Sequence, residues 1–206
     1  MKSNYKVAYD NEWSKLKQLD PTDVERRLNV KYYTDKRQYV VPFFEKDYVL
    51  DFDSETIYRE KDRSVPEISN AIIILNYLTY STENIINTNK WVSLKEIPNG
   101  GALFYPAFYK ASIVELIKKF GKNINIFEQS ALKLGGSYSK FGDKGYEFKV
   151  LPKVNICIAV WEGDDEISPN ATILFEPSIQ HLMHIETVIG IGMCVSNKLL
   201  SISEIK

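Results

Sequence analysis

The chain has 206 residues, of which 44% are hydrophobic, with 26 basic and 27 acidic side chains. This length permits one domain or a small pair, and it is well above the size at which a core needs disulfides or a metal. The formal net charge of −1 argues against broad non-specific binding to DNA or RNA, because such binding needs clustered positive charge. We therefore expect no nucleic-acid partner.

The first residues and the hydropathy of the chain predict a cytoplasmic protein. Met1–Lys6 runs into the charged Asp10 and Glu12 without the apolar stretch of about 7–15 residues that a secretory signal needs. The most apolar window, Ala71–Leu75, stops at Asn76, short of the roughly 20 apolar residues that cross a bilayer. We therefore expect no membrane partner.

Two helices and a hairpin are predicted first along the chain. Apolar and aromatic residues recur every three or four positions from Tyr5 to Leu16, which predicts an amphipathic opening helix. Asp20 and Pro21 begin a second helix, as a capping residue and a first-turn proline. The segments 38–44 and 47–52 are rich in Val, Tyr and Phe and predict a hairpin that turns at 45–46. Pro42 places its strand at a sheet edge or a bulge.

The middle of the chain predicts three helices. Ser64 and Glu67 have the spacing of a capping box, and they precede a core helix that is apolar on nearly all sides. A turn follows at 98–101, and then an amphipathic helix that is entered near Pro106 and ends at Gly121. Another amphipathic helix covers residues 124–134. Because both are apolar along one side only, we expect them to cover a sheet.

The last quarter turns to strands and closes with a helix. Residues 146–150 alternate, 154–160 are almost continuously apolar, and 172–175 form a shorter strand, followed by a helix from Pro177 that carries His181 and His184. Strands and helices are clustered, with no long linker and no repeat. We therefore predict an α+β fold, a single domain over residues 1–206, with a mainly antiparallel or mixed sheet packed by amphipathic helices.

An acidic loop follows the long apolar strand, in the sequence Trp-Glu-Gly-Asp-Asp-Glu at 161–166. Its carboxylates are candidate oxygen ligands for a divalent cation or an acid and base pair, although the frame of a calcium loop is absent. The alternative is a solvated acidic turn that keeps a strand end soluble. The candidate metal ligands are Asp164, Asp165, Glu166 and His184.

The histidines and cysteines give a weaker signal. His181 and His184 are three residues apart, which places them on one helix face, but two ligands do not close a metal site. Adding Cys157 and Cys194 gives four ligands whose long, irregular spacing matches no standard zinc module. Apolar neighbours surround both cysteines, so the simpler interpretation is two reduced, buried thiols.

A second candidate site lies between residues 91 and 105. The double glycine before a helix exposes backbone N–H groups that can hold an anion, and an aromatic ring there can stack on a flat ligand. The alternative is a loop-to-helix joint that simply requires glycine. With Trp161 from the acidic loop, the candidate ligand-binding residues are Trp91, Glu96, Asn99, Gly100, Gly101 and Tyr105.

Charge is distributed unevenly along the chain. Residues 110–153 hold nine Lys and four acidic residues, whereas residues 154–197 hold six acidic residues and neither Lys nor Arg. The balanced total therefore excludes only a uniformly basic surface, and a cation site is expected in the second segment. If the two segments interleave in the fold, the asymmetry reflects internal pairing.

Taken together, several motifs resemble the uncharacterised domain-of-unknown-function family 3786, over a region of about residues 5–200. They are Trp13 and Leu16, Ile74–Leu78, Trp91–Pro98 with Gly100 and Gly101, Tyr105–Phe108, Leu134–Gly136, Pro152, Trp161 with Asp164–Glu166, and Ile173–Glu176. Glu176 departs from the Asp that relatives carry after Leu-Phe. The resemblance implies an anaerobic prokaryotic setting and no established activity. Some relatives carry an added iron–sulfur module with four cysteines; this chain has no such cluster of cysteines.

Three functions follow as hypotheses. The favoured one is an accessory domain that binds a small ligand or a protein partner, using the 91–105 stretch and the acidic loop as one surface. The second is a divalent-metal-dependent, hydrolase-like enzyme that uses the acidic loop. The third is a self-associating structural subunit.

Overall fold

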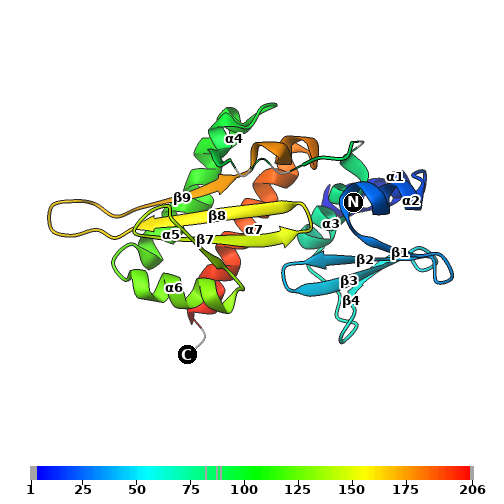
Figure 1. The fold of residues 1–206 in the computed structure, drawn as a ribbon, viewed down its shortest axis with the longest axis horizontal. Helices are drawn as coiled ribbons and strands as arrows, with labels where there is room; N and C mark the ends of the chain where they lie inside the picture. The colour runs from blue at the N-terminus through cyan, green and yellow to red at the C-terminus, as the bar shows by residue number, and fades with distance from the viewer. Residues whose placement is uncertain (1–3, 82, 87, 89, 205–206) are drawn as a thin grey trace.

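The computed structural model describes residues 4–81, 83–86, 88 and 90–204, and it contains two antiparallel sheets (Figure 1). The first sheet has the order β1-β2-β3-β4, with β1 Lys31–Tyr33, β2 Gln38–Phe43, β3 Lys46–Asp51 and β4 Thr56–Arg59. The second has the order β5-β9-β8-β7-β6, with β5 Val92–Ser93, β6 Ser137–Ser139, β7 Lys144–Leu151, β8 Val154–Trp161 and β9 Asn170–Phe175.

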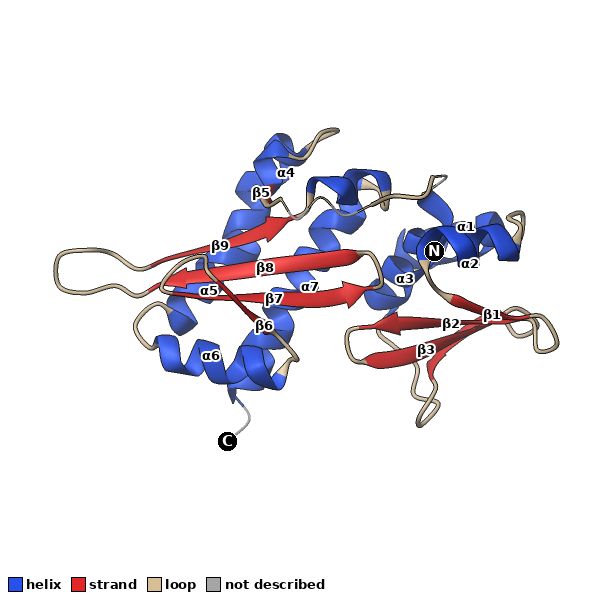
Figure 2. Ribbon diagram, viewed as in Figure 1, coloured by secondary structure: helices blue, strands red, loops and turns tan. Residues whose placement is uncertain are grey.

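Helices pack around both sheets (Figure 2). They are α1 Asn4–Leu16, α2 Pro21–Leu28, α3 Ile68–Tyr80, α4 Gly101–Phe108, α5 Val114–Phe120, α6 Ile124–Lys133 and α7 Ile185–Glu204. A π-helical turn, Tyr109–Ile113, joins α4 to α5, and short 3₁₀ helices η1 Leu94–Glu96 and η3 Pro177–His181 precede α4 and α7. The prediction of a single α+β domain with antiparallel sheets is confirmed.

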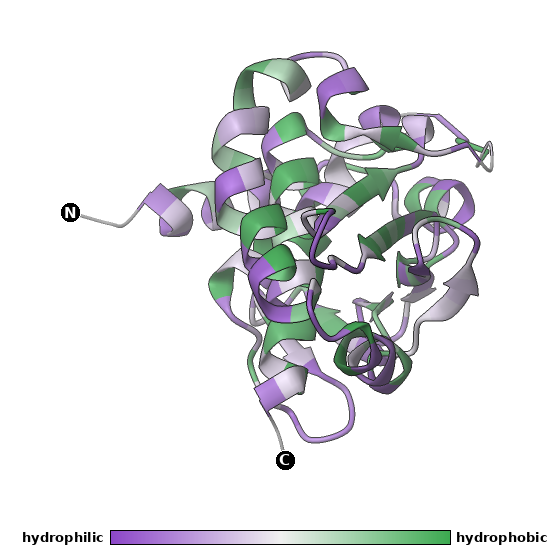
Figure 3. Ribbon diagram, turned by 90° about the vertical axis from the view of Figure 1, so that its left-hand side faces the viewer, coloured by the Kyte–Doolittle hydropathy of each residue, from purple (hydrophilic) through white to green (hydrophobic). Residues whose placement is uncertain are grey.

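One hydrophobic core runs through the whole fold. The middle strands of the larger sheet are green in Figure 3, and purple segments lie mostly on the outside. Residues 156–160 of β8 are buried on both faces of the sheet, which confirms the interpretation of that apolar run. The two sheets meet at the β2–β3 turn, where the Phe44 N–H donates to the carbonyl of Val150 at 2.8 Å.

The predicted hairpin forms, with small differences in detail. Its two turn residues are Phe44 and Glu45, one position earlier than expected. The strand of Pro42 is neither an edge strand nor bulged there, which corrects that expectation: β2 lies between β1 and β3. Pro42 pairs with Asp47 of β3 beyond the end of β1, so its missing N–H costs no ladder bond on the β1 side. The opening helix forms, and Trp13 and Leu16 of its predicted apolar side are buried, whereas Tyr5 at its start is 60% exposed.

Two predicted helix starts are wrong, for physical reasons. The Ser64 hydroxyl donates to Asp62 instead of capping a helix, and α3 begins at Ile68. Pro106 lies inside α4, which begins at Gly101. A proline removes one backbone donor, and the π-helical turn that follows directly accommodates the altered hydrogen-bond ladder.

The predicted closing helix is also divided in two. The 3₁₀ helix η3 ends at His181 and α7 begins at Ile185, so the two histidines do not share one helix face. Among the described helices, α7 alone is long and apolar enough to cross a bilayer by length and composition. Here it is a core helix that packs against α3, α5 and α6.

Helix α7 comes into very close contact with its neighbours at Gly192. A Cβ there would lie 2.9 Å from a ring carbon of Phe108, at the end of α4, and 2.9 Å from one of Phe175, at the end of β9. Both rings are buried and cannot move away freely. At Gly190, two residues earlier in the same helix, a Cβ would make only ordinary van der Waals contact with Ile73.

A buried amide ties α7 to the N-terminal half of the chain. The side-chain amide oxygen Oδ1 of Asn76, in α3, accepts a hydrogen bond from the His184 backbone N–H at 3.0 Å. Its NH₂ group lies 3.5 Å from the Glu12 carboxylate in α1, which also accepts from the Thr79 hydroxyl. Asn76, a polar residue in an otherwise apolar helix, therefore links α3 to α1 and to the start of α7.

We expect Gly192→Ala to lower the free energy of unfolding by about 1–3 kcal/mol, because the added methyl overpacks the contact with Phe108 and Phe175. Gly190→Ala is the matched control, and it should leave stability unchanged or raise it by up to about 1 kcal/mol through helix propensity. Urea unfolding of both variants tests this. Equal effects at the two positions would contradict the close contact.

We also expect Asn76→Ala to cost about 1–3 kcal/mol, because it removes a buried side chain and leaves the part-buried His184 N–H without its acceptor. Thr79→Val removes the hydroxyl bond to Glu12 and a long one to the Asn76 backbone carbonyl, but leaves the His184 bond in place, and should cost less. Denaturant unfolding measures both. A loss for Asn76→Ala no larger than that for Thr79→Val would show that the amide does not anchor α7.

Candidate functional site

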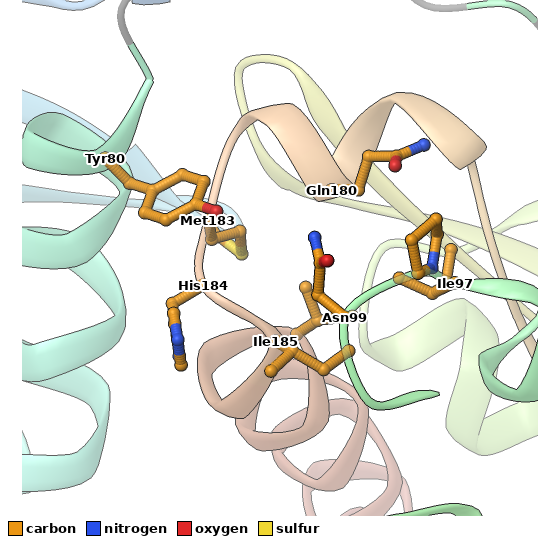
Figure 4. Close-up of a pocket in the computed structure, with 9 residues that line it drawn as sticks. Tyr80, Ile97, Asn99, Gln180, Met183, His184 and Ile185 are labelled. Atoms are coloured by element: carbon orange, nitrogen blue, oxygen red, sulfur yellow. The ribbon is translucent and has the colours of Figure 1, made fainter. Parts of the chain in front are cut away.

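A hollow of about 150 Å³ lies where three distant parts of the chain meet (Figure 4). Its walls come from the end of α3, from the loop between η1 and α4, and from the junction of η3 with α7. Its polar lining residues are Tyr80, Asn99, Gln180 and His184, above an apolar floor that includes Met183 and Ile185. Asn99 and His184, which the sequence placed in two different candidate sites, are therefore brought together.

The loop that carries Asn99 is a tight joint. Asn99 and Gly100 both have positive φ, 63° and 126°. A Cβ at Gly101 would lie 2.0 Å from the carbonyl oxygen of Leu94, so the backbone itself requires glycine there. The geometry supports the structural explanation of the double glycine, in which the joint positions Asn99 at the rim and starts α4.

His184 occupies the turn that begins α7. Its N–H is bonded to Asn76, and its Nδ1 accepts from the Glu186 N–H at 3.4 Å. Its ring packs edge-on against Tyr80, with 6.2 Å between ring centroids. The imidazole is exposed on one side, so it serves the hollow as a polar rim group.

The other candidates from the 91–105 stretch have structural partners. Glu96 accepts from the Ser93 N–H at 2.8 Å and completes a capping box on η1. The Lys95 ammonium lies 4.3 Å from the centre of the Tyr105 ring, a cation–π contact. Trp91 is half-buried next to β5. The Glu96 and Lys95 contacts therefore stabilise the segment that leads into α4, the helix that carries Tyr105.

Helix α4 exposes large apolar side chains to solvent, and sequence reasoning singled out its Gly101 and Tyr105 but not Leu103 or Phe104. Leu103 is 77% exposed, Phe104 37% and Tyr109, in the π-helical turn, 36%. Only Gly101 and Phe108 of α4 are buried. The signal in the sequence was the absence of any charged residue from Ile97 to Tyr109. That pattern also fits a buried helix, and the sequence gives no way to distinguish the two.

The acidic loop lies at the other end of the larger sheet. Trp161 pairs with Asn170 at the start of β9, whereas β5 pairs with Leu174 and Phe175 at its end. The 91–105 stretch and the acidic loop therefore do not form one surface, which corrects that expectation. His184 lies between η3 and α7, after the far end of β9, so it is likewise separated from Asp164, Asp165 and Glu166 in the loop before β9.

Two of the acidic residues have a structural role. The Asp164 carboxylate accepts from the N–H groups of Ile167 and Glu166, at 2.7 and 2.8 Å, and these bonds hold its pKa below the ordinary value. The Glu162 carboxylate accepts from the Ile124 N–H at 3.2 Å, at the start of α6. These bonds fit the alternative interpretation, a solvated acidic turn, and Asp165 and Glu166 are exposed to solvent.

The described residues contain no group of three His, Cys, Asp or Glu side chains placed to hold a metal ion. Burial raises the pKa of the Cys157 thiol to about 12 and that of Cys194 to about 11, so both are protonated near neutral pH. The four-ligand set of two histidines and two cysteines therefore does not assemble among them.

Comparison with known proteins places the chain in a family. Its residues 20–198 match the family described as domain of unknown function (DUF3786). No curated protein and no solved structure matches the chain. The match covers most of the sequence and includes the hollow, α4 and the acidic loop. The chain is a member of the DUF3786 family.

Proposed function

We propose that this protein is an accessory binding module that docks a protein partner on α4. The observation that carries the proposal is the exposure of Leu103, Phe104 and Tyr109, which we call the α4 surface. Large apolar side chains exposed along one short segment of a folded domain are candidates for an interaction site. A helix that served only the core would turn such residues inward, as α3 does with Ile74 and Leu78.

The surroundings of the α4 surface fit such a role. The glycine joint before α4 and Phe108 at its end hold the helix in place, so little conformational entropy is lost on binding. The hollow beside it offers Asn99 and Gln180 as hydrogen-bonding groups. An apolar centre with a polar rim is the usual anatomy of a protein interface.

The other expectations from the sequence have no support from the geometry. Nothing in the structure favours the metal-dependent enzyme, and a bound cation stays a prediction, as does a small ligand in the hollow. The cytoplasmic location and the anaerobic setting also stay predictions.

Site-specific photocrosslinking in the native host tests the proposal. A photoreactive phenylalanine analogue at position 103 should yield one discrete crosslinked species, because Leu103 is the most exposed apolar side chain of α4. The same analogue at the exposed Lys61, in the β4–α3 connection, is the control and should yield none. Identical products from the two positions, or no product from 103, would overturn the proposal.

A variant separates binding from folding. Leu103→Glu should abolish the crosslinked species formed from an analogue at position 104, because it places a charge in the interface. It should change the free energy of unfolding by less than about 0.5 kcal/mol, since exposed positions rarely affect stability more. Unfolding in urea measures the second effect. A large loss of stability would show that α4 belongs to the core.

A further inference from the structure

We infer that the partner of the α4 surface is a second copy of this chain, and that the β8–β9 loop of each copy docks on α4 of the other. This inference rests on the proposed function, because it names the occupant of the same surface. It combines two exposed apolar features, on α4 and on the loop, that the fold keeps apart.

The β8–β9 loop, residues 162–169, projects from the end of the larger sheet (Figure 1). Its exposed apolar side chain is Ile167, 67% exposed, and Trp161 at its base is 37% exposed. The loop is held in shape by the Asp164 bonds and by the Gly163 N–H, which donates to the carbonyl of Gly121 at 2.9 Å. An apolar side chain on an ordered projection can dock with little entropic cost.

The charges beside the two features are opposite in sign. Asp165 and Glu166 precede Ile167, and both are exposed. Lys95 lies over the ring of Tyr105, which is 5.9 Å from that of Tyr109, and Lys110 follows Tyr109 directly; both lysines are also exposed. None of these four residues forms an ion pair with another residue that the structure describes. Docking the loop on α4 would pair carboxylates with ammonium groups around an apolar contact.

Within one chain the two features do not meet. The loop precedes β9, and β5, which leads into η1 and α4, pairs with the far end of β9. The contact is therefore available only between copies. If each loop reaches the other copy's α4, the two contacts are related by a twofold axis and the assembly closes as a dimer.

Analytical ultracentrifugation of the full chain over a range of concentrations tests the inference. We expect a shift from monomer to dimer as concentration rises. Because the loop contact is ionic in part, high salt should weaken dimerisation. The variant with Lys95→Glu and Lys110→Glu should raise the dimer dissociation constant at least about tenfold, and so should the variant with Asp165→Lys and Glu166→Lys. Changing Lys36 and Lys61 to Glu is the matched control and should leave it unchanged.

Charge reversal supplies the decisive measurement. When the two reversed variants are mixed, each interface again joins opposite charges, so the mixture should dimerise more tightly than either variant alone. A misfolded variant could not be rescued in this way.

A chain that stays monomeric at all concentrations, or a dimer whose dissociation constant these substitutions leave unchanged, would overturn the inference. In that case a crosslink from position 103 to a different protein would leave the proposed function intact. Binding of the monomer to vesicles of anionic phospholipid, lost with Leu103→Glu, would instead make α4 a membrane contact and overturn both.

Discussion

The contact of Gly192 with Phe108 and Phe175 determines how the helices and the larger sheet meet. Since no side chain stands between them, the backbone of α7 approaches the end of α4 and the end of β9 directly. Those two rings lie 6.1 Å apart between centroids and are buried. This contact and the glycine joint at 99–101 together hold α4 against the end of the sheet. A larger residue at 192 would separate α7 from both.

The same arrangement explains why α4 remains exposed. Apart from Gly101, its buried residue is Phe108, so the helix is held at its two ends and its middle faces solvent. On the opposite side of the hollow, the bond from the His184 N–H to Asn76 fixes the start of α7. The hollow thus lies between two anchored segments. A surface of this kind is preformed, so binding there would need little rearrangement of the backbone.

The sequence anticipated most elements but not their connections. The β7–β8 pair was predictable because long apolar and alternating runs identify strands directly. The start of α4 was not, because a proline inside the first turns of a helix has the same local appearance as a proline that begins one. The division between η3 and α7 was hidden in a similar way, since the apolar spacing continues through the break at 182–184.

For the candidate site, the sequence by itself identified the segments. It indicated the double glycine, Asn99, His184 and the acidic loop, because residue types and turn signals are local properties. Only the tertiary structure decided which of them meet. The antiparallel pairing of β9 with β5 and β8 sends the two motif-rich loops to opposite ends of one strand, and the burial of α7 brings His184 beside Asn99. The tertiary structure also decided that Leu103 is exposed, because whether an apolar helix is covered depends on what packs against it and not on its own residues.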